Sequence, residues 1–276
     1  MGGYLFGSAA GQPGNPDRTY KKVNMAAGGV TLTNSNGANA LGAYTSLIGG
    51  GGLPEDASAL ILTLGLISST TARAQINLRK NGSTIILPSY YHQGLTNQLQ
   101  KVRIPLKVAT AATLDAAVRT SANGASVVVG LEYEAASTSV SPGFDNVTDF
   151  GFPNNTVVRA STTNLPNTST GAWTEWIADT GANPIGALLA AASDHSTAPT
   201  SSRTALFEMS LGTAGNEDSA IFWEGLARLQ STAPYVIGGN WPLIEHLIPA
   251  HSRISVRQTV GTGDSDLLRF GLWGFY

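Results

Sequence analysis

The sequence predicts an all-β protein, built as two tandem antiparallel β-sandwich domains of jelly-roll-like form that follow an extended N-terminal arm. Three observations lead to this fold class: short β-type runs separated by turns, a near absence of helical periodicity, and a second half that repeats the order of segments in the first. A chain of 276 residues is long enough for two domains that each bury a core of their own.

The β-type runs carry the clearest local signals. Residues 73–79 alternate polar and apolar side chains, as a half-buried strand does. Asn81-Gly82 then predicts a tight hairpin, because both residue types accept the positive φ angles of a two-residue turn. Strands are expected at 59–67, 72–79, 83–87, 101–108, 113–119 and 126–134 in the first half, and at 204–211, 220–229, 243–248, 252–260 and 267–276 in the second.

Composition sets the expected boundaries of the domains. Residues 1–40 are rich in Gly, Asn and Pro, which predicts either an arm that becomes ordered against a partner chain or a loose terminus. Residues 136–170 are dominated by Ser, Thr, Asn, Pro, Gly and Val, a composition typical of a linker. The two sandwiches are therefore expected at 41–135 and 171–276.

An internal repeat is the most informative feature of the chain. The segments Gly42–Ile48 and Gly171–Ile177 share Gly, Ala, Thr and Ile in register. Further matches pair Ile76 and Leu78 with Phe207 and Met209, Ile104-Pro105 with Ile248-Pro249, Leu114, Ala116 and Val118 with Ile254, Val256 and Gln258, and Gly130-Leu131 with Gly271-Leu272. The offset grows from 129 to 144 residues between the first match and the Ile-Pro match, so loops differ while strand order is kept. The alternative is two unrelated β segments of similar composition.

Composition also excludes several classes of function. Charged residues make up only 12% of the chain and the net charge is −2, so nucleic acid is not an expected partner. The absence of cysteine excludes disulfides, thiolate metal sites and cysteine nucleophiles. No stretch approaches the roughly 20 apolar residues of a membrane span, so a membrane is not expected as a partner either.

Candidate catalytic groups do not form a recognised motif. The four histidines are too scattered for a metal site, and Asp194-His195-Ser196 are chain neighbours in a polar loop, whereas a catalytic triad is assembled in space. Glu217, Asp218 and Glu224 form the one sizeable acidic group, and a glycosidase needs a pair of carboxylates. Because residues 212–218 are expected to form a hairpin tip, these carboxylates are interpreted as solvated. No catalytic, cofactor-binding or metal-binding residue is predicted.

The chain resembles the accessory structural proteins of tailed bacteriophage virions. The resemblance rests on the lysine-poor polar surface, the absence of cysteine, the Gly/Asn/Pro-rich arm and the duplicated sandwiches. The phrase Leu211-Gly212-Thr213-Ala214-Gly215-Asn216-Glu217, leading into Ala220-Ile221-Phe222, is also similar to phage jelly-roll proteins. The resemblance implies a virion location and a role in head decoration, a head spike or the tail.

The function expected from this resemblance is that of a non-enzymatic virion protein, which decorates or stabilises a phage capsid by docking on symmetry-related neighbours. Its expected partners are major capsid or tail proteins and further copies of the same chain. The alternative is a receptor- or glycan-binding module associated with the phage tail or fibre. In that module, exposed tryptophans such as Trp223 or Trp241 would contact the glycan.

Overall fold

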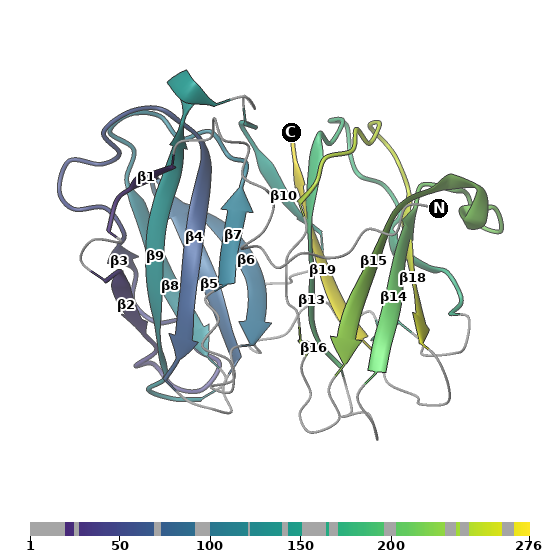
Figure 1. Ribbon diagram of the computed structural model, residues 1–276, viewed down its shortest axis with the longest axis horizontal. Helices are drawn as coiled ribbons and strands as arrows, with labels where there is room; N and C mark the ends of the chain where they lie inside the picture. Colours follow the sequence, from purple (N-terminus) through teal and green to yellow (C-terminus); the bar gives the residue numbers. More distant parts are fainter. Residues whose placement is uncertain are drawn as a thin grey trace.

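The computed structural model describes twelve stretches of the chain, and every structural statement below concerns them. They are residues 20–24, 28–68, 73–91, 100–120, 122–139, 143–150, 164–165, 171–195, 203–229, 236–237, 243–260 and 268–276. The predicted all-β fold with tandem antiparallel sandwiches is confirmed: the described strands form four antiparallel sheets, arranged as two sandwiches (Figure 1). No helix in this part of the chain is long and apolar enough to cross a membrane.

The first sandwich contains the strands up to residue 135. One of its sheets has the order β1–β9–β4–β7 with β2 also on β9, and the other has the order β3–β8–β5–β6. The strands are β1 (Tyr20–Lys22), β2 (Val30–Thr33), β3 (Thr45–Ser46), β4 (Ala57–Ile67), β5 (Arg73–Lys80), β6 (Ser83–Tyr91), β7 (Gln100–Ile104), β8 (Leu114–Thr120) and β9 (Ser126–Ala135).

The second sandwich follows a short 3-10 turn at Ala136–Thr138. One sheet has the order β10–β19–β13–β17 with β11 also on β19, and the other has the order β12–β18–β14–β15–β16. The strands are β10 (Val147–Phe150), β11 (Asn164–Leu165), β12 (Thr174–Ile177), β13 (Ala187–His195), β14 (Arg203–Ser210), β15 (Ile221–Leu229), β16 (Val236–Ile237), β17 (Leu243–Ile244), β18 (Ile254–Val260) and β19 (Leu268–Phe275). A second 3-10 turn, Glu217–Ala220, leads into β15.

The two sandwiches have the same topology. The order β1–β9–β4–β7 becomes β10–β19–β13–β17, and β3–β8–β5–β6 becomes β12–β18–β14–β15. In both sandwiches, two short strands pair with opposite ends of one long strand. These are β1 and β2 on β9 in the first sandwich, and β10 and β11 on β19 in the second. This common order is what a duplication requires, and it lets each strand of one copy be compared with its counterpart in the other.

The predicted hairpin between β5 and β6 is confirmed. Lys80 pairs with Ser83, and the two residues between them have positive φ angles of 49° (Asn81) and 85° (Gly82). Left-handed conformation at both central positions matches the right-handed twist of the flanking strands. The Asn81 side chain also accepts a hydrogen bond from the backbone N–H of Thr113 at 2.9 Å, which ties the turn to the start of β8.

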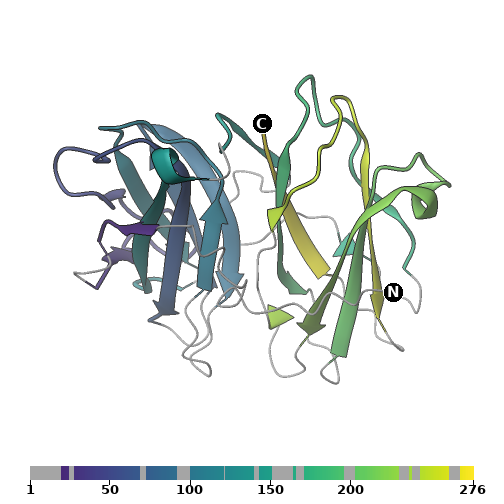
Figure 2. The ribbon, with the colours of Figure 1, turned by 45° about the horizontal axis from the view of Figure 1, so that its top comes forward.

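The sheet β10–β19–β13–β17 is apolar on both faces and joins the sandwiches. Leu188 and Leu272 pack into the core of the second sandwich. The alternate residues of the same two strands pack with the core of the first sandwich: Ala187, Leu189, Trp273 and Phe275. Figures 1 and 2 show β13 and β19 of this sheet lying between the first sandwich and the other sheet of the second sandwich. It therefore helps to cover the first core as well as its own.

Two segments differ from the expected boundaries. Residues 20–22 and 30–33, placed in the N-terminal arm, are strands that pair with β9, while residues 1–19 lie outside the described part of the chain. Residues 147–150, placed in the linker, pair with β19. Composition identifies neither segment as a strand, because each is short and is held by backbone hydrogen bonds to a partner far away in sequence.

Candidate functional site

The outer face of the sheet β12–β18–β14–β15 carries a cluster of charged side chains. Ile254 and Val256 point into the core, so the alternate residues Arg253 and Arg257 point outward. Glu208 of β14 lies directly opposite Arg257 in the β14–β18 register. The position of each side chain therefore follows from strand alternation.

Arg257 is held by carboxylates from two elements. It donates to both carboxylate oxygens of Glu208, at 2.5 Å (Oε2) and 2.8 Å (Oε1), and lies 2.6 Å from Asp218 Oδ1. Hydrogen bonding to Glu208 is the largest contribution to a raised pKa of the Arg257 guanidinium, against a smaller opposing effect of burial. Glu208 is only 4% exposed, so this bidentate pair is a rigid part of the sheet surface.

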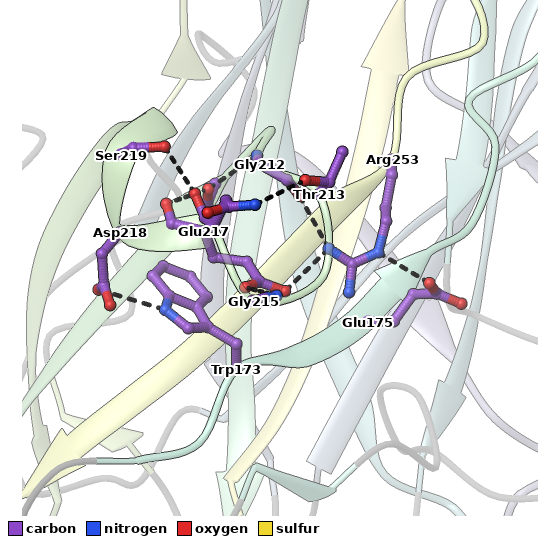
Figure 3. Close-up of polar contacts among 11 residues, drawn as sticks. Trp173, Glu175, Gly212, Thr213, Gly215, Glu217, Asp218, Ser219 and Arg253 are labelled. Carbon is purple, nitrogen blue, oxygen red and sulfur yellow. Dashed lines mark hydrogen bonds and ion pairs between the residues drawn. The ribbon is translucent and has the colours of Figure 1, made fainter.

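Arg253 joins the strands to the loop that follows β14. It donates to Glu175 Oε2 of β12 at 2.8 Å, to the carbonyl oxygen of Gly212 at 2.8 Å, and to Glu217 Oε1 at 3.0 Å (Figure 3). The pKa of Arg253 is raised, chiefly by the hydrogen bond to Glu175. One guanidinium thus fixes the position of the loop relative to two strands.

Glu217 is the buried acid of this loop. Burial raises its pKa, but hydrogen bonds from its own backbone N–H, from Arg253 and from the backbone N–H of Gly215 outweigh burial, so the pKa of Glu217 is lowered. Its carboxylate therefore stays ionised at neutral pH. An acid with a lowered pKa accepts hydrogen bonds well and is poorly suited to donate a proton.

The loop itself is tight. Ser210 Oγ donates to the carbonyl oxygen of Glu217 at 2.6 Å and accepts from the backbone N–H of Gly212 at 2.9 Å. A Cβ atom on Gly212 would lie 2.6 Å from the carbonyl oxygen of Asn216. Gly212 is therefore required for the close approach of the two sides of the loop, which presents Asp218 next to Trp173.

Trp173 is the aromatic residue of the site. Its ring centroid lies 4.5 Å from the Arg257 guanidinium carbon, and its Nε1–H donates to Asp218 Oδ1 at 3.3 Å (Figure 3). A cation against a ring face and a carboxylate at the indole N–H fix the orientation of the ring. The Trp173 side chain is partly exposed at the surface of the sheet.

Several carboxylates around Trp173 face solvent. The side chains of Glu175 and Asp218 are 52% and 72% exposed. Glu224 of β15 is also exposed and lies directly opposite Glu208. Five carboxylates and two guanidinium groups share this face, so it carries a net negative charge. In the part of the chain that the structure describes, no group of three His, Asp or Glu side chains could hold a metal ion.

The two tryptophans expected to contact a glycan are not part of this cluster. Trp223 pairs with Met209, whose side chain is in the second core, and Trp223 is itself partly buried against that core. Trp241 lies outside the described residues. Trp173 entered the sequence analysis only as part of the repeat, although its place two residues before an outward-facing Glu175 was the signal for an outward ring.

Glu217, Asp218 and Glu224 were expected to be solvated carboxylates at a hairpin tip, and two of the three are exposed to solvent. Asp218 and Glu224 are exposed, but Glu217 is 5% exposed and paired with Arg253. The interpretation failed for Glu217 because its partner is 36 residues further along the chain. Of the motif Asp194-His195-Ser196, the first two residues end β13, and Ser196 lies outside the described part.

Comparisons with known proteins give information on the fold alone. No protein-family model and no curated protein matches the sequence. Among solved structures, the chain is similar to PNGF-II at 8% identity and a TM-score of 0.42, covering 95% of this chain and 66% of that chain. It is also similar to PNGase F, a glycosylasparaginase from Flavobacterium meningosepticum, at 9% identity and a TM-score of 0.39, covering 93% and 95% of the two chains. A third structure, of a peptide-N(4)-(N-acetyl-β-D-glucosaminyl) asparagine amidase, has 12% identity and a TM-score of 0.40, covering 89% and 94%.

These matches overturn two predictions of the sequence analysis. The chain was expected to be no enzyme and to decorate a phage capsid, whereas two of the structures named above are of enzymes, a glycosylasparaginase and an asparagine amidase. Both predictions are therefore wrong. At these identities the similarity covers the fold and assigns no catalytic residue to this chain.

The expected virion location, the expected capsid or tail partners and the expected homo-oligomer stay predictions. Light scattering of the purified chain would test the last of them.

Proposed function

We propose that this chain binds a carbohydrate at the outer face of the sheet β12–β18–β14–β15, with Trp173 as the central contact. The observation that carries the proposal is the fixed orientation of the Trp173 ring. Arg257 lies 4.5 Å from its centroid and Asp218 accepts its N–H, while the side chain remains partly exposed.

The chemistry of a sugar suits this arrangement. A pyranose presents apolar C–H groups on one face, which pack on an indole, and hydroxyl groups around its edge, which donate to carboxylates. Asp218, which accepts the Trp173 N–H, and Glu175, two residues further along the chain, both offer exposed carboxylate oxygens. Because the surrounding charge is negative, the expected ligand is a neutral sugar.

Rigidity supports the same proposal. Trp173 is the residue before β12, and the loop that carries Asp218 is fixed by Arg253 and by the buried Glu217. A side chain that is already held in place loses little conformational entropy when a ligand binds. The aromatic ring and its acidic neighbours are thus preorganised before any sugar is present.

The proposal is tested by a glycan array of neutral saccharides, followed by calorimetric titration of the best ligand. Trp173→Ala is expected to weaken binding at least tenfold, since the variant removes the stacking surface. Leu247→Ala is the matched control, because it removes another exposed apolar side chain, 70% exposed, from the same sandwich. Circular dichroism of both variants verifies that they are folded.

Two results would reject the proposal. One is an array that shows no reproducible binding of any neutral glycan, and the other is binding that Trp173→Ala leaves unchanged. Mass spectrometry of the bound glycan after incubation also shows whether the sugar is cleaved, and Glu224 is then the first carboxylate to replace.

A further inference from the structure

The first sandwich carries an aromatic residue and an arginine on the equivalent face. Tyr44 corresponds to Trp173 in the repeat and precedes β3 as Trp173 precedes β12. The Arg79 guanidinium carbon lies 4.1 Å from the Tyr44 ring centroid. Arg79 also donates to Asp115 Oδ2 through Nη2 at 2.7 Å and through Nε at 3.2 Å.

The residues of this face follow from the register of β5 and β8. Ile76, Leu78 and Val118 point into the core. The alternate residues therefore lie on the opposite face of the sheet, where Gln75 lies opposite Arg119, Asn77 opposite Ala117 and Arg79 opposite Asp115. The central residues of this face are buried, and Arg119 and Asp115 at its margin are partly exposed. Arg119 and Asn77 are diagonal neighbours on one surface, with Tyr44 contributed by the adjacent chain segment.

Two polar side chains of this face lack a hydrogen-bond partner within the described part of the chain. Asn77 is 6% exposed, and its Oδ1 accepts no hydrogen bond. Arg119 is partly buried, and its Nε donates none. Burial lowers the pKa of Arg119, and only the Tyr44 hydroxyl opposes this effect. Unpaired polar groups at such positions are rare, because each costs free energy unless a ligand or water satisfies it.

The charge of this face is opposite to that around Trp173. Here Arg79 and Arg119 accompany one carboxylate, Asp115, which Arg79 already engages. Arg119 has no carboxylate partner among the described residues. In the second sandwich, Arg257 stands at the position of Ala117 and Glu208 at that of Asn77, and these two charged residues pair with each other. Thr259 stands at the position of Arg119.

We propose that this face of the first sandwich is a second carbohydrate site, specific for a sugar that carries a carboxylate. The carboxylate pairs with the guanidinium of Arg119, whose planar donors match a carboxylate. Asn77 Oδ1 accepts a hydrogen bond from a sugar hydroxyl, and Tyr44 packs on the sugar ring. The proposal stands apart from the Trp173 site, which lies on another sheet and is expected to take a neutral sugar.

The test is a titration of the full chain, followed by saturation-transfer NMR, with methyl glucuronide as the probe and methyl glucoside as the uncharged control. Glucuronide is expected to bind roughly tenfold more tightly than glucoside, as one charge-assisted hydrogen bond predicts. Arg119→Gln is expected to remove that preference, because the variant keeps a polar side chain and loses the charged guanidinium. Lys22→Gln, which removes one positive charge from the exposed strand β1, is expected to change nothing.

The outcomes separate this site from the Trp173 site. Trp173→Ala is expected to leave glucuronide binding intact, and Arg119→Gln to leave the binding of neutral glycans intact. Equal binding of glucuronide and glucoside would overturn the proposal, as would retained preference in a folded Arg119→Gln variant. Acetate that competes as well as glucuronide would show an unspecific anion contact, and this too would overturn it.

Discussion

Gln258 is a buried amide at a position where the first sandwich has an aliphatic residue. Its side chain is 1% exposed, and neither Nε2 nor Oε1 has a hydrogen-bond partner among the described residues. The corresponding residue in β8 is Val118, which lies in the first core. The second copy therefore pays a desolvation cost at this position that the first copy avoids.

Replacing this amide tests whether it is unsatisfied. We expect Gln258→Leu to raise the free energy of unfolding by about 1–3 kcal/mol, because the variant removes two unpaired polar groups and keeps most of the volume. Urea unfolding followed by tryptophan fluorescence measures the change. A lower stability of the variant would show instead that the amide of Gln258 is hydrogen-bonded in solution.

Glu217 makes the stability of the second sandwich depend on pH. Its pKa in the folded chain is below the ordinary value of 4.5, so the unfolded chain binds a proton more readily than the folded one. The stability that Glu217 contributes is therefore fully present above about pH 4.5 and is lost as the pH falls through the lowered pKa.

The variant Glu217→Gln is expected to lower stability at pH 7 and to reduce the loss of stability on acidification from pH 5 to pH 3. Thermal unfolding at a series of pH values measures both effects. The matched control is Glu224→Gln, which alters an exposed carboxylate of the same face. If the stability of wild type and of Glu217→Gln fell equally steeply between pH 5 and pH 3, this would contradict the role assigned to Glu217.

At the scale of the elements, the pairing of β12 with β18 depends on one glycine. A Cβ atom on Gly171 would lie 2.0 Å from the carbonyl oxygen of Gln258. Any larger residue at this position would therefore push the chain before β12 away from β18. Trp173 and Glu175 reach the site through this segment. The glycine therefore controls the position of the candidate site as well as the local pairing.

We expect Gly171→Ala to cost about 1–3 kcal/mol of stability, as overpacking in a close contact does, and to weaken glycan binding at Trp173. Gly49→Ala is the control, because nothing lies within 4 Å of a Cβ at that position. Chemical unfolding and calorimetric titration give the two readouts. A fully stable Gly171→Ala variant would mean that β12 and β18 tolerate a wider separation.

The equivalent strands β9 and β19 carry different kinds of side chain on their outer faces. On the outer face of the first sandwich, Glu132 and Glu134 of β9 pair with Lys101 and Arg103 of β7 at 3.0 Å and 2.8 Å. The corresponding residues of β19 follow Leu272 as these follow Leu131, and they are Trp273 and Phe275. The first face is polar, with its two buried carboxylates paired to basic side chains, whereas the second face is apolar and packs with the first core.

At the scale of the whole molecule, this apolar face joins the two sandwiches. Phe275 is 1% exposed, and its ring centroid lies 6.3 Å from that of Phe144. The backbone of Phe144 is bonded to the first sandwich, with its N–H donating to the Pro105 carbonyl and its own carbonyl accepting from Lys107 N–H. The segment between the sandwiches is therefore fixed to one and packed against the other.

Phe275→Ala is expected to lower the free energy of unfolding by about 3–5 kcal/mol, the usual cost of removing a buried phenylalanine. It is also expected to reduce cooperativity, so that calorimetry separates the unfolding of the two halves. Leu247→Ala, at a side chain that is 70% exposed, is expected to stay within about 0.5 kcal/mol of wild type. A small effect of Phe275→Ala would show that the sandwiches are stable without this contact.

The sequence by itself determined the fold class, most of the strands and the turn at Asn81-Gly82, because alternation and turn chemistry act between residues close together in the chain. It also related Tyr44 to Trp173 through the repeat. The tertiary structure alone decided that Trp173 lies beside Arg257 on the outer face of its sheet while Trp223 packs against the second core, and that Glu217 is paired with Arg253. It likewise decided that residues 147–150 are a strand. These features depend on contacts between segments tens to more than a hundred residues apart, which no local pattern of side chains records.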